Sequence, residues 1–289
     1  MGTSLSSASM SDAGWRLLLD PPAEGVWNMA VDEVLLDGVA AGSAPPTLRF
    51  YTWTPACLSL GYFQPFSVVD VDGCRGLGID IVRRPTGGRA ILHDRELTYS
   101  VALPASLLGH DAGILPSYRR LSLALQAGLQ RLGIDVSLAP ESEAPTRAVH
   151  GPACFDRPSA HEILLRGRKV VGSAQVRRAG ALLQHGSIVI EPRIETLVAC
   201  LRLDEDPMTV ARRLGGRVAG LAEAGRFEPA SIAGAIAEAF AREFDVQLGP
   251  GRLTEGESRA TGLLVRSKYQ SPDWTRRPLE TAQQTTRTR

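Results

Sequence analysis

Apolar residues recur along this chain with two different periods, and each period predicts a different kind of element. Strands dominate up to Pro192, and the pattern after it is mostly helical. Period-two alternation and β-branched or aromatic runs predict strands at 15–18, 47–53, 57–61, 79–83, 97–103, 134–138, 162–166, 169–177 and 181–190. Apolar residues three and four apart predict helices at 28–39, 118–132, 207–214, 229–244 and 254–266.

Turn and cap residues refine several of these elements. The strand at 15–18 is short and is followed by Pro21–Pro22, which is typical of an edge strand. The strands at 47–53 and 57–61 flank a turn at Pro55 and suggest a β-hairpin. Asn28 and Ser117 are the expected N-caps of the first two helices.

The stretch 162–190 predicts a three-stranded meander with turns at Gly167 and Ala179–Gly180. Alternation places Lys169, Ser173 and Gln175 on one face of the middle strand, and Gly172 and Ala174 on the other. These two small residues leave room for a narrow apolar ligand.

Length and composition restrict the class of protein. The 289 residues suffice for one large domain, or for a domain with a small appendage, and no internal repeat is present. A formal net charge of +1 excludes the broad basic field of a nucleic-acid binder. The chain contains neither the apolar run of a membrane span nor a secretory signal pattern. We therefore expect a cytoplasmic protein that binds neither membranes nor nucleic acid.

The four cysteines lack the close spacing of zinc sites or redox motifs, so no metal site is expected. Cys57, Cys74 and Cys200 are interpreted as small buried apolar residues. Cys154 differs because it follows a proline-bearing loop and precedes Lys169, a cation that could lower the pKa of a nucleophilic thiol.

A second candidate site surrounds the pair Gly87–Gly88. Glycines let backbone approach a ligand closely, and the neighbouring Arg83, Arg84 and Arg89 favour an anion or a polarised carbonyl. A plain turn is the alternative, since neither a P-loop nor a Rossmann fingerprint is present. His93 could act as a general base, although a structural role is the more common one for a loop histidine beside an aspartate.

Nine segments in a fixed order resemble the lipoate-protein ligase A / biotin ligase superfamily. Within it, the chain is similar to the bacterial octanoyl-[acyl carrier protein]:protein N-octanoyltransferases that carry a cysteine nucleophile. The segments are 28–33 (NMAVDE), 47–51 (TLRFY), 60–64 (LGYFQ), 83–89 (RRPTGGR), His93–Asp94 with 97–100 (LTYS), 154–156 (CFD) with Pro158–Ser159, 167–175 (GRKVVGSAQ), 183–187 (LQHGS) and Lys268–Tyr269 before Trp274.

The resemblance implies an α+β fold with a large central mixed β-sheet flanked by helices. We expect residues 14–248 to form the catalytic domain and 249–275 a helical extension packed on that domain. The composition of the two ends, small and polar at 1–13 and rich in Arg, Thr and Gln at 276–289, predicts a disordered N-terminus and a disordered tail.

The resemblance also implies a reaction in two steps. An octanoyl group passes from the phosphopantetheine thioester of acyl carrier protein to Cys154. It then passes to a lysine of a lipoyl-domain protein, typically the glycine cleavage H protein, in lipoate biosynthesis. Lys169 would lower the pKa of Cys154 and orient the thioester carbonyl, and no cofactor is needed because the thioester is already activated. The residues implied in acyl binding are Arg84, Gly87, Gly88, Arg89, His93, Gly172, Ser173, Ala174, His185 and Gly186.

Ala160–His161 departs from the aromatic pair usual in the family, which leaves a role for His161 as a local base open. Three alternative functions also stay open. They are an ATP-dependent lipoate or octanoate ligase, an octanoyl amidotransferase between lipoyl-domain proteins, and a non-catalytic module that binds acyl-proteins.

Overall fold

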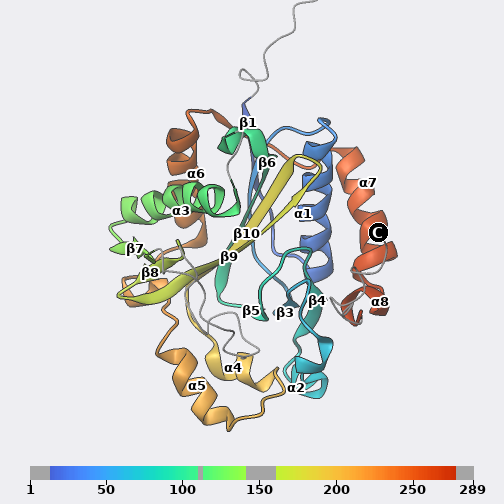
Figure 1. Cartoon of the computed structure of the whole chain (residues 1–289), viewed down its shortest axis with the longest axis vertical. Helices are drawn as coiled ribbons and strands as arrows, with labels where there is room; N and C mark the ends of the chain where they lie inside the picture. The colour runs from blue at the N-terminus through green and yellow to red at the C-terminus, as the bar shows by residue number, and fades with distance from the viewer. Residues whose placement is uncertain (1–13, 110–112, 141–160, 278–289) are drawn as a thin grey trace, which may run out of the picture.

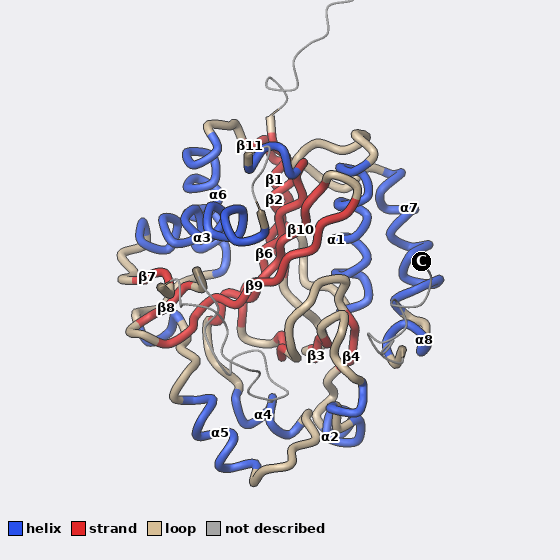
Figure 2. Tube along the Cα trace, in the orientation of Figure 1, coloured by secondary structure: helices blue, strands red, loops and turns tan. Residues whose placement is uncertain are grey.

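The computed structural model describes residues 14–109, 113–140 and 161–277. Its main feature is an eight-stranded mixed sheet with the order β11-β1-β2-β6-β10-β9-β8-β7 (Figures 1 and 2). Strand β1 runs parallel to β11 and β2, and the other neighbours are antiparallel. The strands are β1 (Trp15–Leu19), β2 (Thr47–Tyr51), β6 (Glu96–Pro104), β7 (Val136–Leu138), β8 (Ile163–Leu165), β9 (Arg168–Arg178), β10 (Ala181–Val189) and β11 (Leu248–Pro250).

A smaller three-stranded sheet lies beside the end of the large one, with the order β4-β3-β5. Its strands are β3 (Cys57–Leu60), β4 (Asp80–Arg83) and β5 (Ile91–His93). Three short helices pack near it: α2 (Val71–Gly76), α4 (Ile194–Ala199) and α5 (Pro207–Gly215).

Helices cover both faces of the large sheet (Figure 1). On one face lie α3 (Ile114–Arg131) and α6 (Pro229–Phe244), and on the other lie α1 (Gly25–Ala40) and α7 (Glu255–Leu264). The predicted helical stripes are buried, for example Leu121, Leu125 and Leu129 of α3 against Ile236 and Phe240 of α6. A π-helical turn (Val265–Tyr269) and α8 (Pro272–Thr275) complete the described chain.

The fold class and the meander are confirmed, but two predictions about strand neighbours are wrong. Strand β1 is not at an edge, because β11 pairs with its outer side. Strands β2 and β3 do not form a hairpin, because they belong to different sheets. The alternation of apolar and polar residues in a strand indicates which side chains are buried, but it does not indicate which strand pairs with it. The sequence therefore could not reveal either pairing.

Both predicted N-caps are also wrong. Helix α1 begins at Gly25, and Asn28 lies inside it, fully buried, with its side-chain amide donating to backbone oxygens of Ala23 and Thr52. Helix α3 begins at Ile114, so the hydroxyl of Ser117 donates to carbonyl oxygens of the first turn. In each case the helix starts earlier than the first apolar residue of its stripe.

Strand β11 spans the predicted boundary at residue 248 and joins the main sheet through β1. After it, α7 packs along α1. The carboxylate of Glu33 on α1 accepts bonds from Lys268 (2.7 Å) and Tyr269 (2.6 Å). The domain boundaries stay a prediction, and the predicted disordered ends lie largely outside the described residues. No helix of the described chain combines the length and the apolar character that crossing a membrane requires.

Candidate active site

A cavity lies where the two sheets meet, and we call it the central cavity. The residues that line it come from α1, both sheets and the loop after β4. They are Met29, Tyr51, Trp53, Arg84, Ile91, His93, Thr98, Gly172, Ala174, His185, Gly186 and Ser187. The small residues Gly172 and Ala174 face this cavity, as the alternation of strand β9 predicted. Six residues predicted from the resemblance are therefore brought together around this cavity, namely Arg84, His93, Gly172, Ala174, His185 and Gly186.

Asp32 of helix α1 is fully buried and organises one side of the cavity. Its Oδ1 accepts bonds from Arg49 (2.8 Å) and Ser100 (2.7 Å), and its Oδ2 accepts from Tyr51 (2.8 Å) and His185 Nδ1 (3.0 Å). Four donors thus use the acceptor capacity of the carboxylate. Burial alone would raise the pKa of Asp32, but the His185 bond and the charge of Arg49 hold it below its usual value.

His185 is fixed in one orientation by its two neighbours. Burial lowers its pKa, so the imidazole is neutral at pH 7. Its Nδ1 is protonated and donates a hydrogen bond to Asp32, and its Nε2 accepts a hydrogen bond from the hydroxyl of Thr86 at 2.6 Å. Because Thr86 directly precedes Gly87, this bond ties the predicted glycine loop to the cavity wall.

A second histidine-carboxylate array forms the opposite wall. His93 Nδ1 lies 2.7 Å from Glu96 Oε1, and its Nε2 lies 2.7 Å from the hydroxyl of Ser59. The ring of Trp53 stacks on that of His93 with centroids 3.9 Å apart. The order Ser59–His93–Glu96 has the connectivity of a hydrolase triad, but Ser59 is fully buried and is not part of the cavity lining, so substrate cannot reach its hydroxyl. The array therefore holds its own side chains in place at the cavity and supplies no nucleophile.

Arg84 connects this second array to the glycine loop. Its Nη1 donates to the carbonyl and hydroxyl oxygens of Ser59, and its other nitrogens donate to backbone oxygens of Gly87 (2.9 Å) and Arg89 (2.7 Å). The loop is held further at Gly61, where a Cβ would lie 1.9 Å from the carbonyl oxygen of Gly88. The guanidinium thus braces backbone that lies beside the cavity.

Arg83 has a different role from the anion binding suggested by its position in sequence. It is fully buried and donates to carbonyl oxygens of Gly61 (2.7 Å), Gln64 (2.6 Å) and Thr275 (2.8 Å). Burial and the nearby positive charge of Arg277 lower its pKa to about 10. Arg83 therefore fastens the C-terminal segment to the small sheet.

Lys169, the predicted partner of the nucleophile, is 1% exposed and stands at the start of strand β9. Its Nζ lies 2.5 Å from Oε1 of Glu162, which is itself 4% exposed. Its backbone pairs with the segment around Val218 through bonds to Arg217 and Ala219. A carboxylate this close stabilises the ammonium form of the lysine, which is the form that can stabilise a thiolate.

Several predicted residues lie elsewhere. The hydroxyl of Ser173 pairs with that of Tyr99 at 2.7 Å, on the face of β9 away from the cavity. Gly87, Gly88 and Arg89 form the braced loop without belonging to the cavity lining. Cys154 lies outside the described residues, and its predicted role stays a prediction. His161 is buried with a φ of +66°, and its backbone N–H donates to Ala139.

The three cysteines that the structure describes are buried and free, as predicted. Within residues 14–109, 113–140 and 161–277, no cluster of three or more His, Cys, Asp or Glu side chains could hold a metal ion.

The sequence analysis did not single out Asp32, Glu96 and Glu162, three of the four buried carboxylates of the described residues. The signal was present at Asp32, since an acid in the middle of a helix with few exposed residues must find a partner. The partners of Glu96 and Glu162 depend on strand pairing and could not be read from the chain.

Comparison with known proteins assigns a family to this arrangement. The sequence pattern of the lipoyl protein ligase A/B catalytic domain matches residues 24–244. The chain belongs to this family. Its curated relatives include the octanoyltransferase LipM of Symbiobacterium thermophilum, 43% identical over 277 residues, which cover 92% of this chain and 99% of the relative. The octanoyltransferase LipM of Moorella thermoacetica is 43% identical over 270 residues, covering 91% and 98%. The chain is thus an acyltransferase of the LipM group.

Solved structures of the family confirm the fold. Lipoate-protein ligase A bound with ATP is 25% identical with a TM-score of 0.75, covering 91% of this chain and 99% of that one. A bipartite lipoate protein ligase from Thermoplasma acidophilum, described with its E2 lipoyl domain, is 25% identical with a TM-score of 0.77, covering 91% and 96%. The family fold therefore serves both ligases and octanoyltransferases, and the two activities must differ in the site.

Proposed function

We propose that this protein transfers an octanoyl group from octanoyl-acyl carrier protein, through a thioester on Cys154, to a lysine of a lipoyl-domain protein in lipoate biosynthesis. The observation that carries the proposal is the similarity, over almost the full length of both chains, to octanoyltransferases. The acceptor proposed here is the glycine cleavage H protein. The bipartite ligase described with its E2 lipoyl domain supports a lipoyl-domain partner for this fold.

The first step exchanges one thioester for another. The Cys154 thiolate attacks the acyl carbon, a new C–S bond forms, and the phosphopantetheine thiolate leaves with the electron pair of the broken C–S bond and takes up a proton. The energy of the thioester is retained, so no nucleotide is required. The buried Lys169–Glu162 pair supports this step because it keeps a positive charge in place for the thiolate.

The second step forms an amide. The acceptor lysine loses one proton from its ammonium form to solvent, and the amine then attacks the acyl carbon. The C–N bond forms as the C–S bond to Cys154 breaks, and the departing thiolate takes up a second proton from the amine. The central cavity, with its apolar lining and small residues on β9, supports binding of the acyl chain throughout.

Intact-mass measurement after incubation with octanoyl-acyl carrier protein tests the covalent intermediate. We expect a gain of one octanoyl group that hydroxylamine removes, in the wild type and in the buried-thiol control Cys57→Ala, but not in Cys154→Ser. Full transfer to H protein by Cys154→Ser would refute the thioester. The rate of alkylation of Cys154 against pH should shift to higher pH in Lys169→Ala, because loss of the cation raises the thiol pKa.

Two measurements separate the alternatives. An ATP-dependent ligase would release pyrophosphate with free octanoate and ATP, and we expect no release here. An amidotransferase would accept octanoyl from octanoyl-H protein in preference to octanoyl-acyl carrier protein. A non-catalytic binding module would bind the donor without ever becoming acylated.

A further inference from the structure

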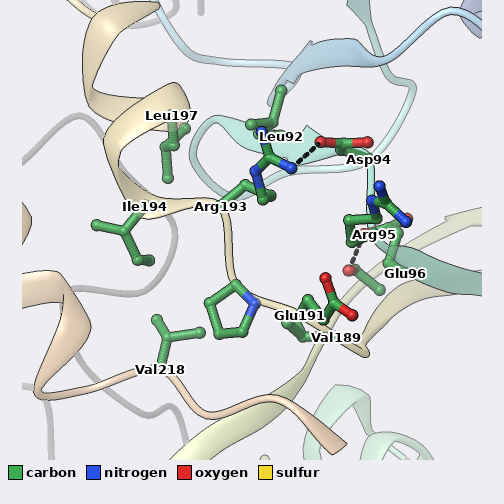
Figure 3. Close-up of a pocket in the computed structure, with 12 residues that line it drawn as sticks. Leu92, Asp94, Arg95, Glu96, Val189, Glu191, Arg193, Ile194, Leu197 and Val218 are labelled. Atoms are coloured by element: carbon green, nitrogen blue, oxygen red, sulfur yellow. Dashed lines mark hydrogen bonds and ion pairs between the residues drawn. The ribbon is translucent and has the colours of Figure 1, made fainter. Parts of the chain in front are cut away.

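A second cavity lies beside the central cavity along strand β10, and we call it the side slot (Figure 3). Ser187 lines both cavities. His185, Ser187 and Val189 follow each other at every second position of one strand, so their side chains lie on one face. His185 belongs to the central cavity and Val189 to the side slot, so the two cavities are neighbours along β10 with Ser187 between them.

The walls of the side slot are apolar. They are built by Leu92, Val189, Ile194, Leu197 and Val218, which come from β5, β10, α4 and the segment that pairs with Lys169. Such walls offer few hydrogen-bond partners to the amide groups of a phosphopantetheine arm, whereas they suit the methylene groups of a lysine side chain. From Ser187 to Val189 the strand rises about 7 Å, which is comparable to an extended side chain of four methylenes.

The inner end of the slot carries a buried carboxylate. Glu96 lies directly across the sheet from Val189, and it accepts bonds from the hydroxyl of Ser187, from the hydroxyl of Thr98 and from His93 Nδ1. Although burial raises the pKa of Glu96, the charge and hydrogen bond of His93 and the two hydroxyl bonds hold it below its usual value, so the group is ionised at neutral pH. A carboxylate has about four acceptor sites, so one site is left for a cationic or amine-bearing ligand.

The outer end of the slot is charged. Asp94, Arg95, Glu191 and Arg193 line the slot and are labelled in Figure 3, where Nη1 of Arg193 lies 3.7 Å from Oδ2 of Asp94. Arg95, Glu191 and Arg193 are exposed, so this rim is open to solvent and to a partner protein. A ligand entering here would pass from a charged surface, between apolar walls, to a carboxylate beside the central cavity.

We propose that the side slot receives the lysine side chain of the acceptor protein and delivers its amine to the acyl group in the central cavity. The methylenes of the lysine lie against the apolar walls, and Glu96 attracts its amino group before the attack. The inference rests on the proposed function, because it assigns the binding site of the acceptor in the second step. The phosphopantetheine arm of the donor is the other chain that could enter, and the test distinguishes the two.

The first test narrows the slot from the side of α4, away from Lys169. In Ile194→Trp, formation of the acyl-enzyme from octanoyl-acyl carrier protein should keep its wild-type rate. Transfer from the isolated acyl-enzyme to H protein should fall at least about 10-fold, equivalent to about 1.4 kcal/mol of lost transition-state stabilisation. The matched control is Met208→Trp on α5, an exposed apolar residue outside the slot, which should change neither step.

The second test uses the wild-type acyl-enzyme and small amines, so it does not depend on a variant folding. Aminolysis by Nα-acetyl-lysine amide should saturate and exceed aminolysis by the ornithine analogue about 10-fold or more, the effect of one missing methylene in an apolar site.

Three results would overturn the inference. If Ile194→Trp slowed both steps equally, the slot would belong to the donor arm. If it slowed neither step, or if the lysine and ornithine amides reacted at equal rates, the slot would not bind the acceptor lysine. A wild-type protein that never becomes acylated refutes the proposed function, and the role of the slot with it.

Discussion

Replacing Lys169 by methionine would remove the ammonium group from a buried ion pair while keeping the volume of the side chain nearly unchanged. The pair is nearly inaccessible to water, with 1% of the Lys169 side chain and 4% of the Glu162 side chain exposed, and its charged atoms lie 2.5 Å apart. The variant leaves the Glu162 carboxylate buried without the positive charge that now contacts it.

Removing one member of such a buried pair typically costs about 3–5 kcal/mol in free energy of unfolding. For a chain of this size each kcal/mol corresponds to about 2–4 °C in Tm, so Lys169→Met should melt roughly 6–20 °C below the wild type. The double variant Lys169→Met/Glu162→Leu removes both charges, and an apolar pair of similar volume is often as stable as the ion pair it replaces. The double variant should therefore recover most of the loss.

Urea denaturation of the wild type, both single variants and the double variant measures the coupling free energy between the two positions. The matched control is the pair Arg75–Asp72, which has a similar distance of 2.6 Å but side-chain exposures of 74% and 86%. Arg75→Met should cost less than about 1 kcal/mol, because water already solvates both charges. Two results would contradict this reasoning. They are a loss of unfolding free energy in Lys169→Met no larger than that in Arg75→Met, and a double variant no more stable than Lys169→Met.

Other predictions concern the cavity walls and the C-terminal segment. Because burial lowers the pKa of His185 in the folded protein, its contribution to stability is complete above about pH 6.5 and is lost as pH falls below that value; thermal melts from pH 7.5 to 5 should show a steeper loss for the wild type than for His185→Gln. In Gly186→Ala the new Cβ would lie 2.6 Å from the carbonyl oxygen of Gly172 and 2.7 Å from Tyr99, so urea titration should show a loss of about 1–3 kcal/mol, whereas Gly234→Ala meets open space on α6 and should gain about 0.5–1 kcal/mol. Glu33→Gln weakens the bonds from Lys268, Tyr269 and Arg178, so limited proteolysis should cut the C-terminal segment faster than in the wild type, and an equal rate would contradict its role as the anchor.

There is a physical reason why octanoyltransferases of the LipM group and lipoate ligases share one fold. Thioester exchange and ATP-dependent activation both need an apolar cavity for the acyl chain and a fixed positive charge near the reacting carbonyl. In this chain the central cavity is built from α1, both sheets and the loop after β4, and the positive charge that we propose for the reaction is that of Lys169 on β9. Both features belong to the scaffold, which can therefore serve either chemistry.

The sequence by itself determined the elements and their periods. The stripes of α3 and α6, the meander 162–190 and the small residues Gly172 and Ala174 beside an apolar cavity all followed from local spacing, because burial and backbone geometry act at neighbouring positions. The ordered motifs also determined the family.

Only the tertiary structure decided which elements are neighbours and which charges meet. It placed β11 beside β1, separated β2 from β3, and brought Asp32 to His185 across 153 positions of sequence. It also showed that Arg83 and Arg84, which the sequence suggested as anion ligands, donate hydrogen bonds to backbone carbonyl oxygens. A residue's charge is local, but its partner depends on strand pairing over long separations, and no local pattern in the chain specifies that pairing.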